Sequence, residues 1–312
     1  MARGTWMVLG AAFLWGTSFP LIEIGYAGGL RPYAFLYYRY VIATLALLVI
    51  AIATRNVRFD LFKEPRLLLL AGLNLVGYIT QFLGQDLTTA SKASLLVNVN
   101  VLMTALLAVW FLRERLGRGL LVGCGLGLVG LFLLTTNGDL STLRLTNKEL
   151  VGDLLAFTTG ICWTIYILVA KRFLDRHDTN AISFTLVIFV VTTVLLLPIT
   201  MVMEGLSYTG TPKAGGAIVY LALFSSVGAF LLWQQGLKEI PASVSSILLL
   251  FEVLVALAIS IPLLGERLGG WSAVGAALIL TSIYLASRGP AAPVLATPPV
   301  APEQPSSTEP GM

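Results

Sequence analysis

Two short stretches of the chain repeat each other and define its architecture. Residues 111–117 are Phe-Leu-Arg-Glu-Arg-Leu-Gly, and residues 263–269 are Leu-Leu-Gly-Glu-Arg-Leu-Gly. Both contain Glu-Arg-Leu-Gly in register at an offset of 152 positions, and at the same offset Gly84 corresponds to Gly236. Self-similarity at a fixed offset marks a duplicated unit. The chain is therefore predicted to contain two copies of one unit.

The composition is that of a membrane protein. Of the 312 residues 57% are hydrophobic and only 12% are charged, and the mean hydropathy is +0.87. Soluble domains carry about a quarter charged residues, because charge keeps their surface hydrated. A helix needs about 20 apolar residues to cross a bilayer, and runs that are apolar on every face exclude a β-barrel. Ten such runs lie at residues 5–24, 33–53, 67–85, 92–112, 118–135, 150–171, 180–203, 214–235, 242–264 and 270–287.

Ten runs in two copies give five spans per copy. Because five is odd, the second copy enters the membrane from the opposite side, so the repeats are inverted. The predicted fold class is an all-α integral membrane protein of ten transmembrane helices arranged as two inverted five-helix repeats. The repeats are expected over residues 1–137 and 150–288, with an outer linker over 138–149. Residues 289–312 hold seven of the fourteen prolines and are expected to form a disordered cytoplasmic tail.

The basic residues indicate the orientation. If the N-terminus is cytoplasmic, thirteen of the twenty Lys and Arg residues lie at inner loops and six at outer loops, and Arg39 lies within a span. Cytoplasmic loops are enriched in bases. Both termini are therefore predicted to be cytoplasmic, in a multi-pass protein of the cytoplasmic (inner) membrane. This distribution accounts for the pI near 9.1, and no nucleic-acid partner is expected.

Three ionisable residues fall clearly inside the spans. Such groups are costly in a bilayer, so each is a functional candidate. Glu23 and Arg39 lie at similar depth near the outer side and are predicted to form an ion pair, with either a gating or a packing role. Glu252 lies about ten residues into the ninth span, and its repeat counterpart is Asn100. Its carboxylate is expected to bind the ammonium group of a substrate or to carry a proton in a coupled exporter; a hydrogen bond between helices is the structural alternative.

Aromatic and amide residues cluster at related depths. Trp15 and Trp163 lie near mid-helix, where the interfacial belt typical of membrane tryptophans is not available. They are expected to line a central cavity, and ordinary helix packing is the alternative. An aromatic wall with a few amides suits an amino acid better than a sugar phosphate, which would need several buried bases. The candidate substrate-binding residues are Trp15, Tyr78, Gln81, Asn98, Asn100, Trp163, Tyr166 and Glu252.

No catalytic centre, metal site or cofactor is expected. Cys124 and Cys162 lie in apolar runs and are interpreted as buried thiols, and His177 lies alone in a polar loop. An enzyme acting on lipid would need clustered His, Asp or Ser at the membrane surface. Residues 125–130 fit the dinucleotide fingerprint, but no strand precedes them, so these glycines, with Gly275 in the tenth span, are expected to permit close helix packing.

Other residues are expected to shape or join the helices. Pro20, Pro198 and Pro262 interrupt spans and are expected to kink them or to act as hinges. Glu114 and Glu266 lie at helix ends beside arginines. For these two carboxylates, pairing between helices or loops is more plausible than contact with a substrate.

The order of these motifs resembles the drug/metabolite transporter superfamily, in particular its EamA type. The resemblance rests on Leu-Trp-Gly-Thr-Ser-Phe-Pro at residues 14–20, on Arg39, and on the duplicated Glu-Arg-Leu-Gly, and it spans about residues 5–287. The chain is most similar to the YddG-type amino-acid exporters. It departs from many relatives at residues 98–100, where Asn-Val-Asn replaces a Glu-Pro pair, which weakens transfer of a substrate preference.

The resemblance implies a secondary transporter that moves its substrate by alternating access between the inverted repeats. The expected substrates are amino acids, aromatic or otherwise neutral, or related small metabolites, and the expected direction is export. The alternatives are a passive metabolite channel and an exporter of drug-like or nucleotide-related amphiphiles. The expected partners are the small-molecule substrate and the lipid bilayer, and the protein is expected to act as a monomer.

Overall fold

The fold was analysed in a computed structural model that describes residues 2–88, 90–115, 117–139, 147–264 and 269–288. These residues form helices and their connections, and no strand. In chain order the elements are α1 (Ala2–Gly16), α2 (Ser18–Ala27), α3 (Pro32–Ala53), the 3-10 helix η1 (Phe59–Lys63), α4 (Pro65–Leu87), α5 (Ala90–Val97), α6 (Asn100–Phe111), α7 (Arg118–Thr136), α8 (Asn147–Arg176), α9 (Ala181–Met203), α10 (Pro212–Tyr220), the π-helix η3 (Leu221–Gly228), α11 (Ala229–Glu239), α12 (Ala242–Leu249), α13 (Phe251–Leu264) and α14 (Gly270–Arg288).

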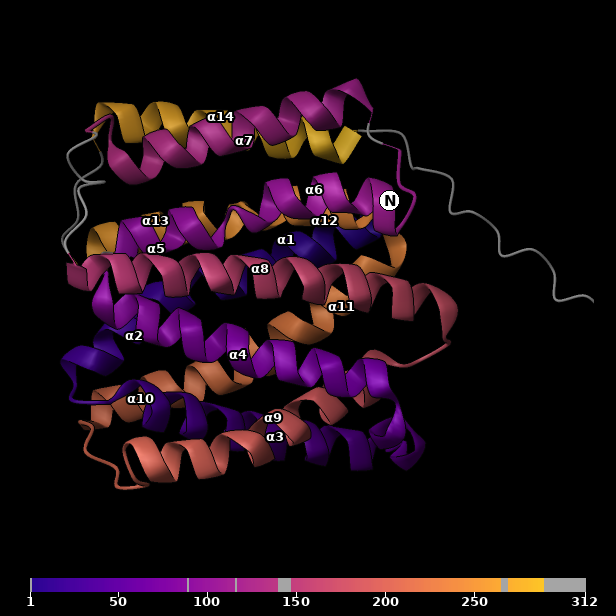
Figure 1. The fold of residues 1–312 in the computed structure, drawn as a ribbon, viewed down its shortest axis with the longest axis vertical. Coiled ribbons are helices and arrows are strands. Elements are labelled where there is room, and N and C mark those ends of the chain that lie inside the picture. The colour runs from indigo at the N-terminus through magenta and orange to yellow at the C-terminus, as the bar shows by residue number, and fades with distance from the viewer. Residues whose placement is uncertain (1, 89, 116, 140–146, 265–268, 289–312) are drawn as a thin grey trace, which may run out of the picture.

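The predicted ten spans are confirmed. In the described part of the chain, nine helices are long and apolar enough to cross a membrane, and the shorter apolar helix Leu95–Phe111 supplies the fourth span. Helix α1 belongs to the first span and α8 is the sixth, so these two helices run in opposite directions, as Figure 1 shows. The predicted tail, residues 289–312, lies outside the described residues.

Several spans are broken, and two of the breaks are related by the repeat. The fourth span is divided between α5 and α6 at residues 98–99, and the ninth is divided between α12 and α13 at Leu250. These positions correspond at the offset of 152. Interruptions at corresponding positions of two repeats are the best sequence pointer to a transport site. Pro198 lies inside α9 and Pro262 inside α13, and neither proline ends its helix.

The bundle has a centre and two flanks. The pair α7 and α14 lies at one end of the long axis and the pair α3 and α9 at the other, with the remaining helices between them (Figure 1). Each flanking pair joins the second or the fifth span of one repeat to its counterpart in the other. This symmetric pairing leaves the first, third, fourth, sixth, eighth and ninth spans to build the centre.

The first helix of each repeat packs on the other repeat. Helix α1 lies mainly against α11, α12 and α13, and α8 lies against α4, α5 and α6. Glycine permits the close approach at equivalent crossings. A Cβ on Gly236 would meet the Gly4 carbonyl oxygen at 2.8 Å, and a Cβ on Gly152 would meet the Thr88 nitrogen at 2.8 Å. The two repeats are thus interlocked by an exchange of their first helices.

The glycines of the fingerprint-like run mostly serve helix packing. A Cβ on Gly130 would meet the Gly275 carbonyl oxygen at 2.7 Å, and one on Gly127 would meet the Leu250 and Ser282 side chains. The prediction that these glycines permit close helix packing is therefore correct for Gly127 and Gly130, which lie against α14. It is wrong for Gly125, which has no atom within 4 Å of an added Cβ and lies on the exposed side of α7.

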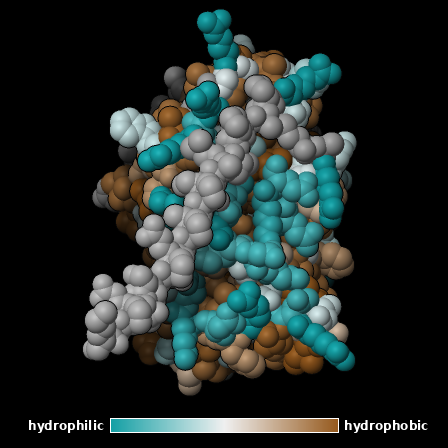
Figure 2. Space-filling view, turned by 90° about the vertical axis from the view of Figure 1, so that its right-hand side faces the viewer, coloured by the Kyte–Doolittle hydropathy of each residue, from teal (hydrophilic) through white to brown (hydrophobic). Residues whose placement is uncertain are grey.

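The end of the bundle at which α1 begins is here called the N-terminal face, and the opposite end the far face. Figure 2 looks onto the N-terminal face, where hydrophilic side chains gather. Large apolar side chains are exposed on both central and flanking helices: Trp110 of α6 is 87% exposed and Val202 of α9 is 83% exposed. Exposed apolar side chains of this size are suited to contact with the lipid of a membrane. Exposed bases of the N-terminal face include Arg3, Arg55, Arg58, Lys63, Arg66, Arg113, Arg115, Arg118, Arg176 and Arg288.

Candidate functional site

A cavity lies at the centre of the bundle, where the two broken helices meet. Its volume is about 80 Å³. Ile22 of α2 and Gln81 of α4 extend the lining into the half nearer the far face. The lining residues are Trp15, Ser18, Phe19, Ile22, Arg39, Tyr78, Gln81, Val97, Asn98, Asn100, Trp163, Tyr166, Ile167, Phe230, Trp233, Leu249 and Glu252.

All eight candidate substrate-binding residues line this one cavity, and Arg39 joins them. The sequence interpretation missed several other lining residues, and helical spacing relates most of them to a tryptophan. Ser18, Phe19 and Ile22 come three, four and seven residues after Trp15, so they share its helix face. Phe230 likewise precedes Trp233 by three residues. Helical spacing from Trp15, a predicted lining residue, could have found Ser18, Phe19 and Ile22, whereas Phe230 is spaced from Trp233, which was not itself predicted.

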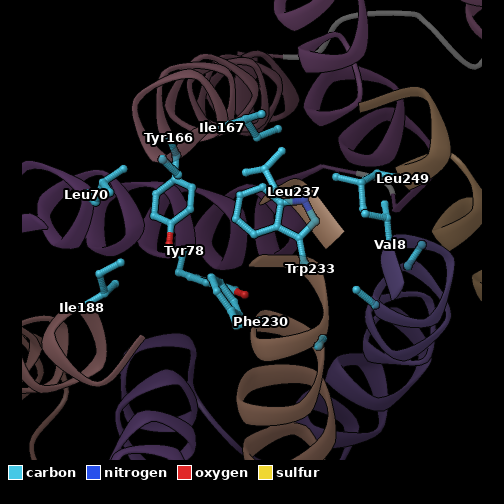
Figure 3. Close-up of a cluster of buried hydrophobic side chains, with 14 of the residues drawn as sticks. Val8, Leu70, Tyr78, Tyr166, Ile167, Ile188, Phe230, Trp233, Leu237 and Leu249 are labelled. Atoms are coloured by element: carbon cyan, nitrogen blue, oxygen red, sulfur yellow. The ribbon is translucent and has the colours of Figure 1, made fainter. Parts of the chain in front are cut away.

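Aromatic rings form a continuous wall around the cavity. The Tyr78 and Trp163 ring centroids are 5.1 Å apart, those of Trp163 and Tyr166 are 5.6 Å apart, and those of Tyr166 and Trp233 are 5.8 Å apart. Phe230 closes the wall, and Figure 3 shows it together with Tyr166 and Trp233, turned toward one another. Edge-to-face and tilted contacts of this kind hold rings in fixed orientations. The wall is therefore a rigid surface that fits an apolar or aromatic group.

Glu252 brings a carboxylate to this wall. It lies in the first turn of α13, directly after the break in the ninth span, and it lines the cavity beside its repeat counterpart Asn100, the first residue of α6. Within the described residues Glu252 has neither an ion-pair partner nor a hydrogen-bonded side chain. A structural bond between helices, the third interpretation of this residue, is thus not formed. A carboxylate facing an aromatic cavity without a protein partner is suited to a ligand that carries positive charge.

The predicted ion pair between Glu23 and Arg39 is wrong. Both residues are described, and Glu23 is exposed on α2, whereas Arg39 is 1% exposed and lines the cavity. The Arg39 Nε donates a hydrogen bond of 2.8 Å to the Ser226 hydroxyl, and its guanidinium lies 5.0 Å from the Tyr78 ring centroid. Similar depth in the membrane does not fix the direction of a side chain around its helix, and these two point apart.

Polar contacts close the bundle at the N-terminal face. Helix α6 packs against α12 at this face. The repeat counterparts of these two helices are α13 and α5, which lie at the far face. Among the described residues, α5 and α13 make no comparable contact with each other. The Glu114 carboxylate accepts hydrogen bonds from the Ala242 nitrogen at 2.7 Å and from the Ser243 nitrogen at 3.1 Å and hydroxyl at 2.5 Å. The expected helix-to-helix role of Glu114 is confirmed: it caps the N-terminus of α12 from the other repeat. Glu266 lies outside the described residues.

Replacing Glu114 with alanine is expected to destabilise the protein by about 1–3 kcal/mol, because two buried backbone N–H groups lose their acceptor. The measurement is the unfolding midpoint of the purified protein in mixed detergent and SDS micelles. Glu239→Ala is the control: that carboxylate also lies at the N-terminal face, but it pairs with the exposed Arg3 at 3.7 Å, and such pairs contribute little. Equal midpoints for the two variants would contradict the role of Glu114 as a cap.

Sequence and fold comparisons agree with this architecture. The model of the EamA-like transporter family matches the chain twice, at residues 2–136 and 150–288. The uncharacterized transporter YyaM of Bacillus subtilis is 27% identical over 288 residues, which cover 90% of this chain and 92% of that protein. A probable terminal-alkyne amino-acid exporter of Streptantibioticus cattleyicolor is 25% identical over 291 residues, covering 92% and 94%.

A solved crystal structure shares the fold. It superimposes with a TM-score of 0.79 at 17% sequence identity and covers 92% of this chain and 97% of its own. The two matches of the family model together span most of the chain and fall on the two interlocked halves described above. The chain therefore belongs to the EamA-like transporter family and is a multi-pass membrane transporter of a small molecule, not an enzyme.

Proposed function

We propose that this protein exports free amino acids with apolar or aromatic side chains by alternating access. The observation that carries the proposal is the unpartnered Glu252 carboxylate in an aromatic cavity. The carboxylate would accept hydrogen bonds from the substrate's ammonium group, and the wall of Trp15, Trp163 and Tyr166 would receive its side chain. Gln81, Asn98 and Asn100 would supply neutral polar contacts. A relative named as a probable amino-acid exporter supports the same substrate class.

The proposed orientation indicates the side of the membrane toward which this structure is closed. The exposed bases of the N-terminal face support placing that face, and with it both termini, in the cytoplasm. In this orientation the structure is closed toward the cytoplasm by the contact between α6 and α12. The complementary state, with α5 and α13 packed together and α6 and α12 apart, would load substrate from the cytoplasm.

Transport by purified protein in sealed proteoliposomes tests the proposal. We expect saturable flux of tryptophan, phenylalanine or leucine from a panel of radiolabelled amino acids, and accelerated exchange when the vesicles are preloaded with unlabelled substrate. Glutamate and lysine should be moved at least about tenfold more slowly, because their charged side chains would be buried against the aromatic wall. Absence of flux across the whole panel would rule out the substrate assignment.

The same proteoliposome assay distinguishes the proposed function from two alternatives. A passive channel would give flux that neither saturates nor shows exchange. An exporter of drug-like amphiphiles would move apolar amines and leave the amino acids behind. Repeating the assay with and without a pH gradient shows whether protons are coupled to the substrate.

A further inference from the structure

The eighth span changes its helical form beside the cavity. Between α10 and α11 it winds as the π-helix η3, whose wider turn places the consecutive residues Ser225 and Ser226, both fully buried, against two neighbouring spans. The Ser225 carbonyl oxygen accepts a hydrogen bond of 2.9 Å from the Trp15 indole nitrogen. The Ser226 hydroxyl accepts the 2.8 Å hydrogen bond from Arg39 Nε. Segments of π-helix inside α-helices occur frequently at functional sites.

These contacts orient the Arg39 guanidinium but use only some of its hydrogen-bond donors. A guanidinium has five N–H donors. In the described residues Ser226 takes one of them, and the Tyr78 hydroxyl, 3.5 Å from Nη2, takes a second through a long contact. The Tyr78 ring also lies beneath the guanidinium. The side chain is therefore fixed in direction, while most of its donors have no acceptor in the part of the chain that the structure describes.

Arg39 also lacks a countercharge. No acidic side chain of the described residues lies within 4 Å of it, and it is 1% exposed within a membrane span. Glu252 lines the same cavity, yet it forms no ion pair with Arg39. A buried charge without a partner is expensive. An anion supplied from the cavity would remove that cost and satisfy the free donors, and a carboxylate fits the planar fork of a guanidinium.

We propose that Arg39, oriented by Ser226 of the π-helix, binds the carboxylate of the substrate. The inference rests on the proposed function and deepens it: Glu252 takes the ammonium and Arg39 the carboxylate, so the cavity selects molecules that present both groups together. The substrate class is then the free α-amino acid. Amines of the same shape that lack the carboxylate, and acids that lack the ammonium, are the compounds that it discriminates against.

The test compares ligands that differ only in the carboxylate. Binding of tryptophan and tryptamine, and of leucine and 3-methylbutylamine, is measured on the purified full-length protein by isothermal titration. For the unaltered protein we expect each amino acid to bind at least tenfold more tightly than its amine. In Arg39→Gln the amino acids should lose at least tenfold in affinity and the amines less than threefold, so the preference disappears.

Further variants separate recognition from folding. Arg39→Lys keeps the positive charge but loses the planar guanidinium, so it should retain part of the preference for amino acids over amines. Ser226→Ala should weaken binding of the amino acids only. Arg288→Gln is the matched control, because this arginine also lies over an aromatic ring, that of Tyr284 at 4.5 Å, but outside the cavity. The Arg288→Gln variant should prefer amino acids over amines to the same extent as the unaltered protein.

The possible results lead to different conclusions. If Arg39→Gln and Arg39→Lys weaken amino acids and amines equally, or weaken neither, the carboxylate role is overturned while amino-acid transport stands. If the unaltered protein binds neither amino acid and transports none of the panel, the proposed function itself fails. Loss confined to the ligands that carry a carboxylate supports the inference.

Discussion

Replacing Glu252 with glutamine is expected to lower tryptophan flux in proteoliposomes at least about tenfold. Hydrogen bonds to charged groups contribute about 1.5–3 kcal/mol, and each 1.4 kcal/mol changes an equilibrium constant about tenfold. Glutamine is nearly isosteric, so the cavity keeps its shape and loses only the charge. Because Glu252 has no protein partner in the described residues, no buried cation is stranded by the change, and the protein should fold as before.

The same variant distinguishes the two roles considered for this carboxylate. If Glu252 binds the ammonium, exchange of tryptophan at equal pH on both sides is lost along with net flux. If it carries a proton, exchange at equal pH persists and only the response to a pH gradient disappears. Glu239→Gln, an acid at the N-terminal face outside the cavity, should leave flux and exchange unchanged. Glu252→Gln with normal flux and normal pH dependence would exclude both roles.

Replacing Gly275 with valine is expected to prevent stable assembly of the bundle. An added Cβ would lie 2.5 Å from the Gly130 carbonyl oxygen and 2.5 Å from the Leu134 nitrogen. Both contacts are to backbone, so no side-chain rotation relieves them, and α14 must separate from α7. Overpacking typically costs about 1–3 kcal/mol, and valine adds two methyl groups beyond the Cβ. We expect little monodisperse protein in size-exclusion chromatography after extraction in mild detergent.

Gly125 offers a matched control on α7. It belongs to the same glycine-rich run as Gly130, but an added Cβ there meets no atom within 4 Å. Gly125→Val should therefore yield as much folded protein as the unaltered chain, and Gly275→Ala should fall between the two valine variants. A Gly275→Val protein that is extracted and unfolds like the unaltered one would show that α7 and α14 do not meet as described.

The sequence was informative wherever one physical requirement dominated. The length of a bilayer crossing fixes the spans, and an odd number of spans per copy fixes the inversion. Placing the Glu252 carboxylate and two mid-helix tryptophans in contact with lipid is unfavourable, and this was sufficient to predict that they line an internal cavity. Helical spacing from Trp15 would have extended the predicted lining to Ser18, Phe19 and Ile22 as well.

Other features depend on contacts that no local pattern encodes. The breaks in the fourth and ninth spans fall at residues 98–99 and at Leu250, where there is no proline, while Pro198 leaves α9 continuous. The partner of Arg39 is a serine 187 positions away on a π-helix. Its expected partner, Glu23, faces away because the rotation of α2 about its axis is set by packing and not by depth in the membrane.

The exchange of first helices has a consequence for how the protein is made. Helix α1 is synthesised before the second-repeat helices that cover it, which begin only at Leu221 of η3. Helix α8, in contrast, finds α4, α5 and α6 already in the membrane. One face of α1 in the nascent first repeat therefore stays uncovered until α11, α12 and α13 of the second repeat have been synthesised.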